Sequence, residues 1–162
     1  MLIRQIVLLS IACIALTSCA HRNQSDVYAQ QAAARRQAEE AEKQAAREST
    51  ARYVVSHKMQ MSMEIQKAIE DSLRGKLKDP ESARFKHYFV GETGVENVFS
   101  ACGEVNAKNS YGGYVGSVPY SSEIHIESNN GKKSYYATAT IADLKYVDIF
   151  FKFYPQCDGL FK

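Results

Sequence analysis

The chain lacks an excess of charge of either sign. Its 162 residues include 20 lysines and arginines against 18 aspartates and glutamates, a formal net charge of +2. Nucleic-acid binding normally uses a concentrated basic surface, so this near-balance argues against a nucleic-acid partner. The composition, 45% hydrophobic and 23% charged, suits one small globular domain together with non-globular segments.

Metal-binding and catalytic signatures are missing as well. The four cysteines are Cys13, Cys19, Cys102 and Cys157. They form no Cys-x-x-Cys pair and no paired histidine spacing accompanies them, so we expect no structural zinc. The sequence contains no phosphate-binding loop of the Gly-x-x-x-x-Gly-Lys-Ser/Thr type. We therefore expect no metal, no cofactor and no enzymatic activity.

The apolar run near the start of the chain is too short to cross a membrane. It covers the eleven residues from Ile6 to Leu16, whereas a bilayer-spanning helix needs about 20. Arg4 precedes this run and small residues follow it, which is the order of an export signal. A plain signal peptide and an N-terminal membrane anchor are the alternatives at this point.

The residues after the apolar run, Leu16-Thr17-Ser18-Cys19, resemble the lipobox of bacterial lipoproteins. The resemblance implies cleavage before Cys19, diacylglycerol on its sulfur and an acyl chain such as palmitate on its amino group. Several acyl chains together form a durable anchor, whereas one chain binds a membrane only marginally. Ala20, where an aspartate would favour inner-membrane retention, implies the periplasmic face of the outer membrane. We thus expect a signal peptide at 1–18 and a membrane-tethered mature chain.

The next segment contains neither glycine nor proline from residue 25 to 50. Alanine, glutamine, glutamate and arginine dominate it, and nearly all of these residues favour a helix. The side that would pack consists mainly of alanines, which bury little area. We therefore assign 19–51 to a solvated helical spacer. An oligomerisation helix, or a helix lying along a partner, is the alternative.

Residues 52–162 have the patterns of a globular α+β domain. Ile65, Ile69, Leu73 and Leu77 recur every four residues, which predicts an amphipathic helix from Met59 to Leu77. Four strand-like runs follow, at 85–90, 97–107, 114–127 and 134–141, and predict a mostly antiparallel sheet. Residues 144–154 suit a helix between Asp143 and Pro155, although their aromatic run would also suit a strand.

Cys102 and Cys157 are the cysteines of this domain. Export would place them in an oxidising compartment, so we expect a structural disulfide between them. The alternative is a catalytic thiol, which needs a nearby base. His87 and His125 are present, but neither belongs to a recognised cysteine-activating motif.

Two stretches of the domain resemble a group of small uncharacterised proteins, often lipoproteins, from proteobacteria and their phages. These stretches are 77–85, with the pattern LKDPxSAxF, and 102–116, with the pattern CGxVNAKNxxGGYxG. The resemblance implies a shared fold and no particular activity.

The second stretch supplies the candidate binding residues: Asn106, Lys108, Asn109, Tyr111 and Tyr114. Polar side chains beside a Gly-Gly turn could hold a carboxylate, a sugar or a peptide, with the tyrosines flanking it. Alternatively, the asparagines stabilise the turn and the tyrosines pack. The sequence favours a lipid-anchored, non-enzymatic module that binds an envelope protein or the cell wall. A cell-wall hydrolase and a phage-type exclusion lipoprotein are the alternative functions.

Overall fold

The computed structural model of the chain describes residues 24–114 and 116–161. The predicted signal peptide and the predicted lipidation site, Cys19, lie outside the described residues. The chain divides into two compact units with the boundary after Glu42, and each unit is described by itself. No helix of the described ranges is both long and apolar enough to cross a membrane.

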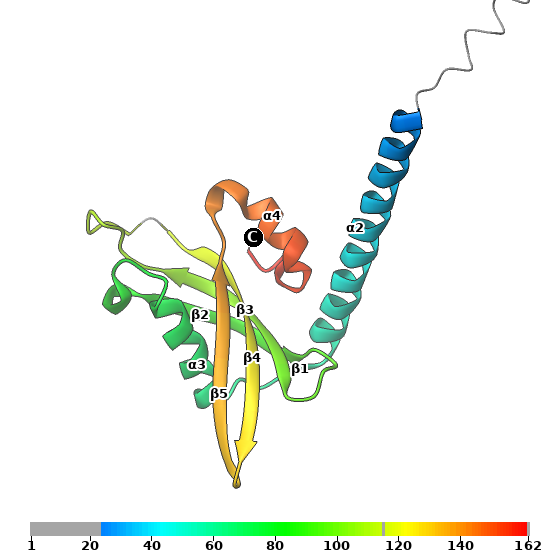
Figure 1. The fold of residues 1–162 in the computed structure, drawn as a ribbon. Helices are drawn as coiled ribbons and strands as arrows, with labels where there is room; N and C mark the ends of the chain where they lie inside the picture. Colours follow the sequence, from blue (N-terminus) through cyan, green and yellow to red (C-terminus); the bar gives the residue numbers. More distant parts are fainter. Residues whose placement is uncertain (1–23, 115, 162) are drawn as a thin grey trace, which may run out of the picture. The chain divides into compact units, whose positions relative to one another are not determined.

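Helix α2 covers Gln24–Ser56 (Figure 1). In the first unit, residues 24–42, nearly every side chain of this helix is exposed to solvent. In the second unit its last turns bury Ala51 and Val54, and Val54 belongs to a core cluster. The helix therefore extends beyond the predicted segment of 25–50, because the apolar side chains near its end have a core to pack against.

The second unit is built on an antiparallel sheet with the strand order β1-β2-β3-β4-β5 (Figure 1). The strands are β1 (Lys58–Met59), β2 (Arg84–Glu92), β3 (Val98–Asn106), β4 (Val118–Asn129) and β5 (Lys132–Ile141). The α+β class is as predicted, but the prediction of four strands is wrong. The additional strand, β1, has two residues, which are too few to show the alternation by which a strand is recognised in sequence.

Helix α3 (Met63–Arg74) covers one face of the sheet. It buries Ile65, Ile69 and Leu73, the residues whose spacing predicted it. It begins later than the predicted Met59 because Ser62 caps it, accepting a hydrogen bond from the Ile65 amide. The sheet residues of this core are Val90, Ala101, Val105, Tyr120, Ile124 and Ala139.

The C-terminal segment packs on the other face. It consists of η2 (Leu144–Tyr146), α4 (Val147–Phe153) and η3 (Pro155–Cys157), so the helical alternative for 144–154 is correct. Phe150 and Cys157 join a second core cluster with Phe89 and Cys102 of the sheet. Successive strand residues point to opposite faces, which explains why Cys102 belongs to this cluster and its neighbour Ala101 to the first.

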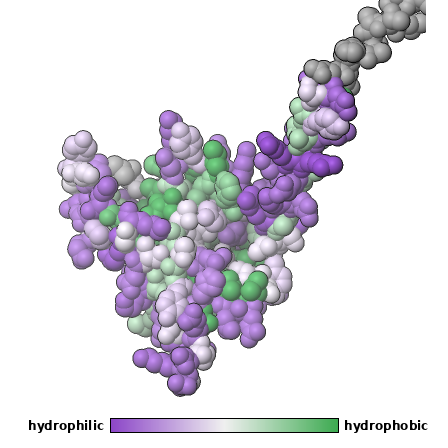
Figure 2. All heavy atoms as spheres, in the orientation of Figure 1, coloured by the Kyte–Doolittle hydropathy of each residue, from purple (hydrophilic) through white to green (hydrophobic). Residues whose placement is uncertain are grey.

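Hydrophilic side chains predominate on the surface seen in Figure 2, and hydrophobic ones form scattered patches between them. Leu144, Ile149 and Phe153 of the C-terminal segment contribute exposed apolar side chains. Isolated apolar residues are normal on protein surfaces and by themselves indicate no interface. These exposed apolar side chains therefore do not define a binding site.

Candidate functional site

The predicted binding block forms a tight turn organised by Asn109. Its side-chain Oδ1 accepts hydrogen bonds from the Tyr111 amide at 2.9 Å and the Gly113 amide at 3.2 Å. Between them, Gly112 adopts a positive φ of 80°, a conformation that glycine adopts without steric cost. The Asn109 side chain is thus engaged within the turn, as the structural alternative for this block requires.

The two motif stretches meet at one corner of the domain. The Ser82 Oγ accepts a hydrogen bond from the Lys108 amide at 2.9 Å, and the Ser82 carbonyl oxygen accepts one from the Tyr114 hydroxyl at 3.0 Å. Arg84 pairs with Asn106 across β2 and β3 and lies 4.7 Å from the centre of the Tyr114 ring. These contacts give both stretches a structural role in holding the turn against the start of β2.

The predicted binding residues differ in their solvent exposure. Tyr111 is 95% exposed at the tip of the turn and Tyr114 is 40% exposed. Lys108 lies beside Tyr114, with its Nζ 5.8 Å from the ring centre. The Asn106 Oδ1, by contrast, is buried and accepts no hydrogen bond from the described residues. Lys108 and Tyr114 therefore lie side by side, Tyr111 is freely exposed, and the buried Oδ1 of Asn106 is out of reach of a ligand at the surface.

Glu70, His87 and Tyr120 form a hydrogen-bonded trio that the sequence did not predict. The His87 Nε2 lies 3.1 Å from Glu70 Oε1, and its Nδ1 bonds the Tyr120 hydroxyl. A carboxylate only accepts hydrogen bonds, so the His87 Nε2 donates to Glu70. Burial raises the pKa of Tyr120 well above its usual range, and the charge of Glu70 adds to the rise. The phenol is fully buried and cannot meet a substrate, so the trio ties α3 to the sheet.

The structure brings Cys102 and Cys157 to disulfide distance, as predicted. Their Cα atoms are 5.5 Å apart and both side chains are fully buried. A bonded, buried pair offers no thiolate, so this geometry favours the structural interpretation of the two cysteines over a catalytic one.

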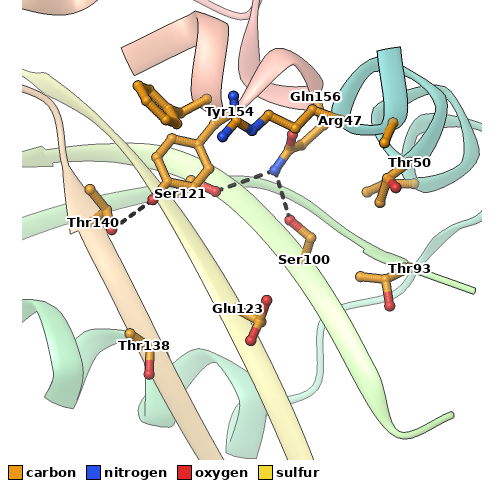
Figure 3. Close-up of a pocket in the computed structure, with 13 residues that line it drawn as sticks. Arg47, Thr50, Thr93, Ser100, Ser121, Glu123, Thr138, Thr140, Tyr154 and Gln156 are labelled. Atoms are coloured by element: carbon orange, nitrogen blue, oxygen red, sulfur yellow. Dashed lines mark hydrogen bonds between the residues drawn. The ribbon is translucent and has the colours of Figure 1, made fainter. Parts of the chain in front are cut away.

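A hollow lined by both polar and apolar side chains lies on the sheet face that carries α4. Figure 3 shows this cavity, about 500 Å³ in volume, between the sheet, the C-terminal segment and the end of α2. All its lining residues belong to the second unit. Six serine and threonine side chains line it: Thr50, Thr93, Ser100, Ser121, Thr138 and Thr140. A volume of this size falls within the range of about 300–1,000 Å³ that small-molecule sites occupy.

The inner wall of this cavity is held by side-chain hydrogen bonds. The Gln156 amide nitrogen donates to the hydroxyls of Ser100 at 3.0 Å and Ser121 at 3.4 Å, as the dashed lines in Figure 3 show. The Tyr154 hydroxyl donates to the Thr140 hydroxyl at 3.1 Å. Thr138 is exposed, and no such bond engages it within the described part of the chain. Its side chain is one of those that line the cavity.

Charged groups of both signs also line the cavity. The Arg47 guanidinium lies 4.5 Å from the centre of the Phe153 ring. Glu123 is the one carboxylate among the described lining residues, and it lies 2.7 Å from His125. Most glycosidases use two carboxylates that flank the scissile bond. The described residues also contain no group of three metal-ligating side chains. The described lining residues of the cavity therefore do not form the two-carboxylate pair of that class of enzyme.

Sequence reasoning did not find this cavity because its residues come from positions 46 to 156. One signal was present: on β3, Ser100 lies between the apolar residues Phe99 and Ala101, whereas on β4 Ser122 separates Ser121 from Glu123 and hides the alternation. Comparison of the chain with known protein families, curated proteins and solved structures found no match.

Proposed function

We propose that this chain is a lipid-anchored protein of the cell envelope, whose globular unit is a non-enzymatic binding module. The anchor is a diacylglycerol on Cys19, with the protein at the periplasmic face of the outer membrane. The proposal for the anchor is supported by the match of residues 16–19 to the lipobox directly after an apolar run. Several acyl chains on one residue would hold the mature chain durably at a membrane.

The proposed binding function is supported by the hydroxyl-lined cavity. Hydroxyl groups both donate and accept hydrogen bonds, so the exposed hydroxyls of Thr50 and Thr138 can pair with a ligand that is itself rich in hydroxyls. Phe153 and Tyr154 add aromatic surface beside this wall. A cell-wall glycan has this chemistry and lies within reach of a periplasmic module, so we propose the glycan strand as the ligand.

Hydrolysis of the cell wall is less well supported than binding. Glu123 is the lone carboxylate among the described residues of the cavity and is already paired with His125. The buried phenol of Tyr120 and the cysteines Cys102 and Cys157 have no access to the cavity's ligand space. An exclusion lipoprotein would use the same anchor with a protein ligand, and the binding experiment below separates the two.

We expect the mature chain with Cys19→Ser to co-sediment with purified cell-wall sacculi. Replacing Thr50 and Thr138 by valine removes two exposed hydroxyls with little change of shape. Each lost hydrogen bond is worth about 1 kcal/mol, so the double variant, which loses two, should bind about thirtyfold more weakly. The matched control is Ser49→Ala with Ser128→Ala, which removes two exposed hydroxyls outside the cavity.

Three results would count against this assignment. Failure of the mature Cys19→Ser chain, with its cavity residues unchanged, to co-sediment with the sacculi would exclude the wall as its ligand. Equal binding by the cavity variant and the control would place the site elsewhere. Release of soluble wall fragments during incubation would show that the module is an enzyme.

A further inference from the structure

A second hollow, about 480 Å³ in volume, lies between the segment that follows α3 and the turn that Asn109 organises. Three lysines line it: Lys76 and Lys78 follow α3, and Lys108 belongs to the turn. We call it the lysine groove. It shares Thr140 with the hydroxyl-lined cavity but otherwise has its own lining. It therefore offers a separate site.

The charge of the lysine groove is uncompensated. Neither aspartate nor glutamate occurs among its described lining residues, and none of the three lysines forms an ion pair with a described residue. Two carboxylates nearby along the chain are engaged with backbone amides. Asp79 accepts from the Ser82 amide, and Asp143 accepts from the Lys145 amide at 2.9 Å. The charged side chains among the described lining residues of the groove are thus all positive, although the whole chain carries a net charge of only +2.

The rest of the lysine groove is mainly apolar. Leu77, Val105, Val118 and Ile141 contribute side chains, most of them partly buried. Lysine ammonium groups bind phosphate as point charges, whereas planar, two-pronged recognition of a carboxylate is characteristic of arginine. A ligand that suits this lining carries a phosphate and an adjoining apolar part.

We propose that the lysine groove binds the phosphate head group of an anionic phospholipid. Basic residues close to an anionic membrane each contribute about 1 kcal/mol of attraction. The closeness of the groove to a membrane rests on the proposed function, because a domain tethered through Cys19 stays within reach of lipid head groups. The groove would then hold the domain against the membrane, in addition to the acyl chains that hold its N-terminus.

The proposal can be tested without the anchor. The full mature chain with Cys19→Ser is mixed with vesicles of phosphatidylcholine alone or with added phosphatidylglycerol. We expect binding only to the anionic vesicles. Lys76→Gln, Lys78→Gln and Lys108→Gln together should weaken binding about a hundredfold, at about fivefold for each lysine. Lys→Arg at the same positions should retain it, because the charge is kept.

The matched control removes the same charge elsewhere: Lys132→Gln, Lys133→Gln and Lys152→Gln. Lys132 and Lys133 begin β5, whereas Ile141 of the groove ends it. Weak binding by this control as well would show a general charge effect and overturn the site. Binding of inorganic phosphate or of an acidic peptide, without binding of anionic vesicles, would overturn the lipid assignment. Because the variant lacks Cys19, none of these results depends on lipidation.

Discussion

Loss of the Cys102–Cys157 disulfide should lower the free energy of unfolding by about 4 kcal/mol. The two cysteines are 55 residues apart in sequence, so the bond closes a long loop in the unfolded chain. In the folded domain it joins β3 to η3 within the second core cluster. We expect the double variant Cys102→Ala, Cys157→Ala to unfold at a much lower urea concentration than the oxidised protein.

A reducing agent provides the control for this experiment. It should lower the stability of the unmodified protein towards that of the double variant, and it should leave the double variant unchanged. Two free thiols in protein purified from the periplasm, with unaltered urea unfolding in the double variant, would show that the bond does not form.

Gly103→Ala should destabilise the domain by about 3 kcal/mol, at the upper end of the usual cost of overpacking. A Cβ at position 103 would lie 2.4 Å from the Lys86 carbonyl oxygen and 2.4 Å from the Tyr120 hydroxyl oxygen. The Tyr120 ring is fully buried and cannot retreat without breaking its hydrogen bond to His87. Thermal unfolding of the purified variant would measure the loss.

Gly113→Ala is the matched control for Gly103→Ala. A Cβ there would meet nothing closer than the Asn109 Oδ1 at 3.9 Å, and the backbone of Gly113 does not have a positive φ. This variant should unfold within about 0.5 kcal/mol of the unmodified protein, as is usual for exposed positions. Equal stability of both variants would contradict the packing ascribed to Gly103.

The sequence predicted the fold class because most elements carry a clear periodicity. The spacing of Ile65, Ile69 and Leu73 gave α3, and alternation gave the strands that now pair as β2 to β5. The one strand that the sequence did not predict, β1, consists of Lys58 and Met59. Its strand conformation follows from pairing with Val90 and Gly91, residues about 30 positions away, and no local pattern encodes that contact.

The candidate sites were harder to predict than the fold. The block from Asn106 to Tyr114 stood out because its polar and glycine residues are contiguous, and much of that pattern serves the turn that Asn109 organises. The hydroxyl-lined cavity and the lysine groove are each assembled from distant segments. Only the sheet register, which pairs Ser100 with Glu123 and Glu123 with Thr138, brings such residues into one row.

The proposed lipid anchor on Cys19 is the basis for the proposed location in the cell envelope, and mass spectrometry of the mature N-terminus tests it most directly. The full-length chain is expressed in bacteria supplied with labelled palmitate, beside a Cys19→Ser variant. We predict an N-terminal peptide that begins at Cys19 and carries a thioether-linked diacylglycerol and an acylated amino group, with no label in the variant. An unmodified thiol at Cys19, or undiminished labelling of Cys19→Ser, would contradict the anchor.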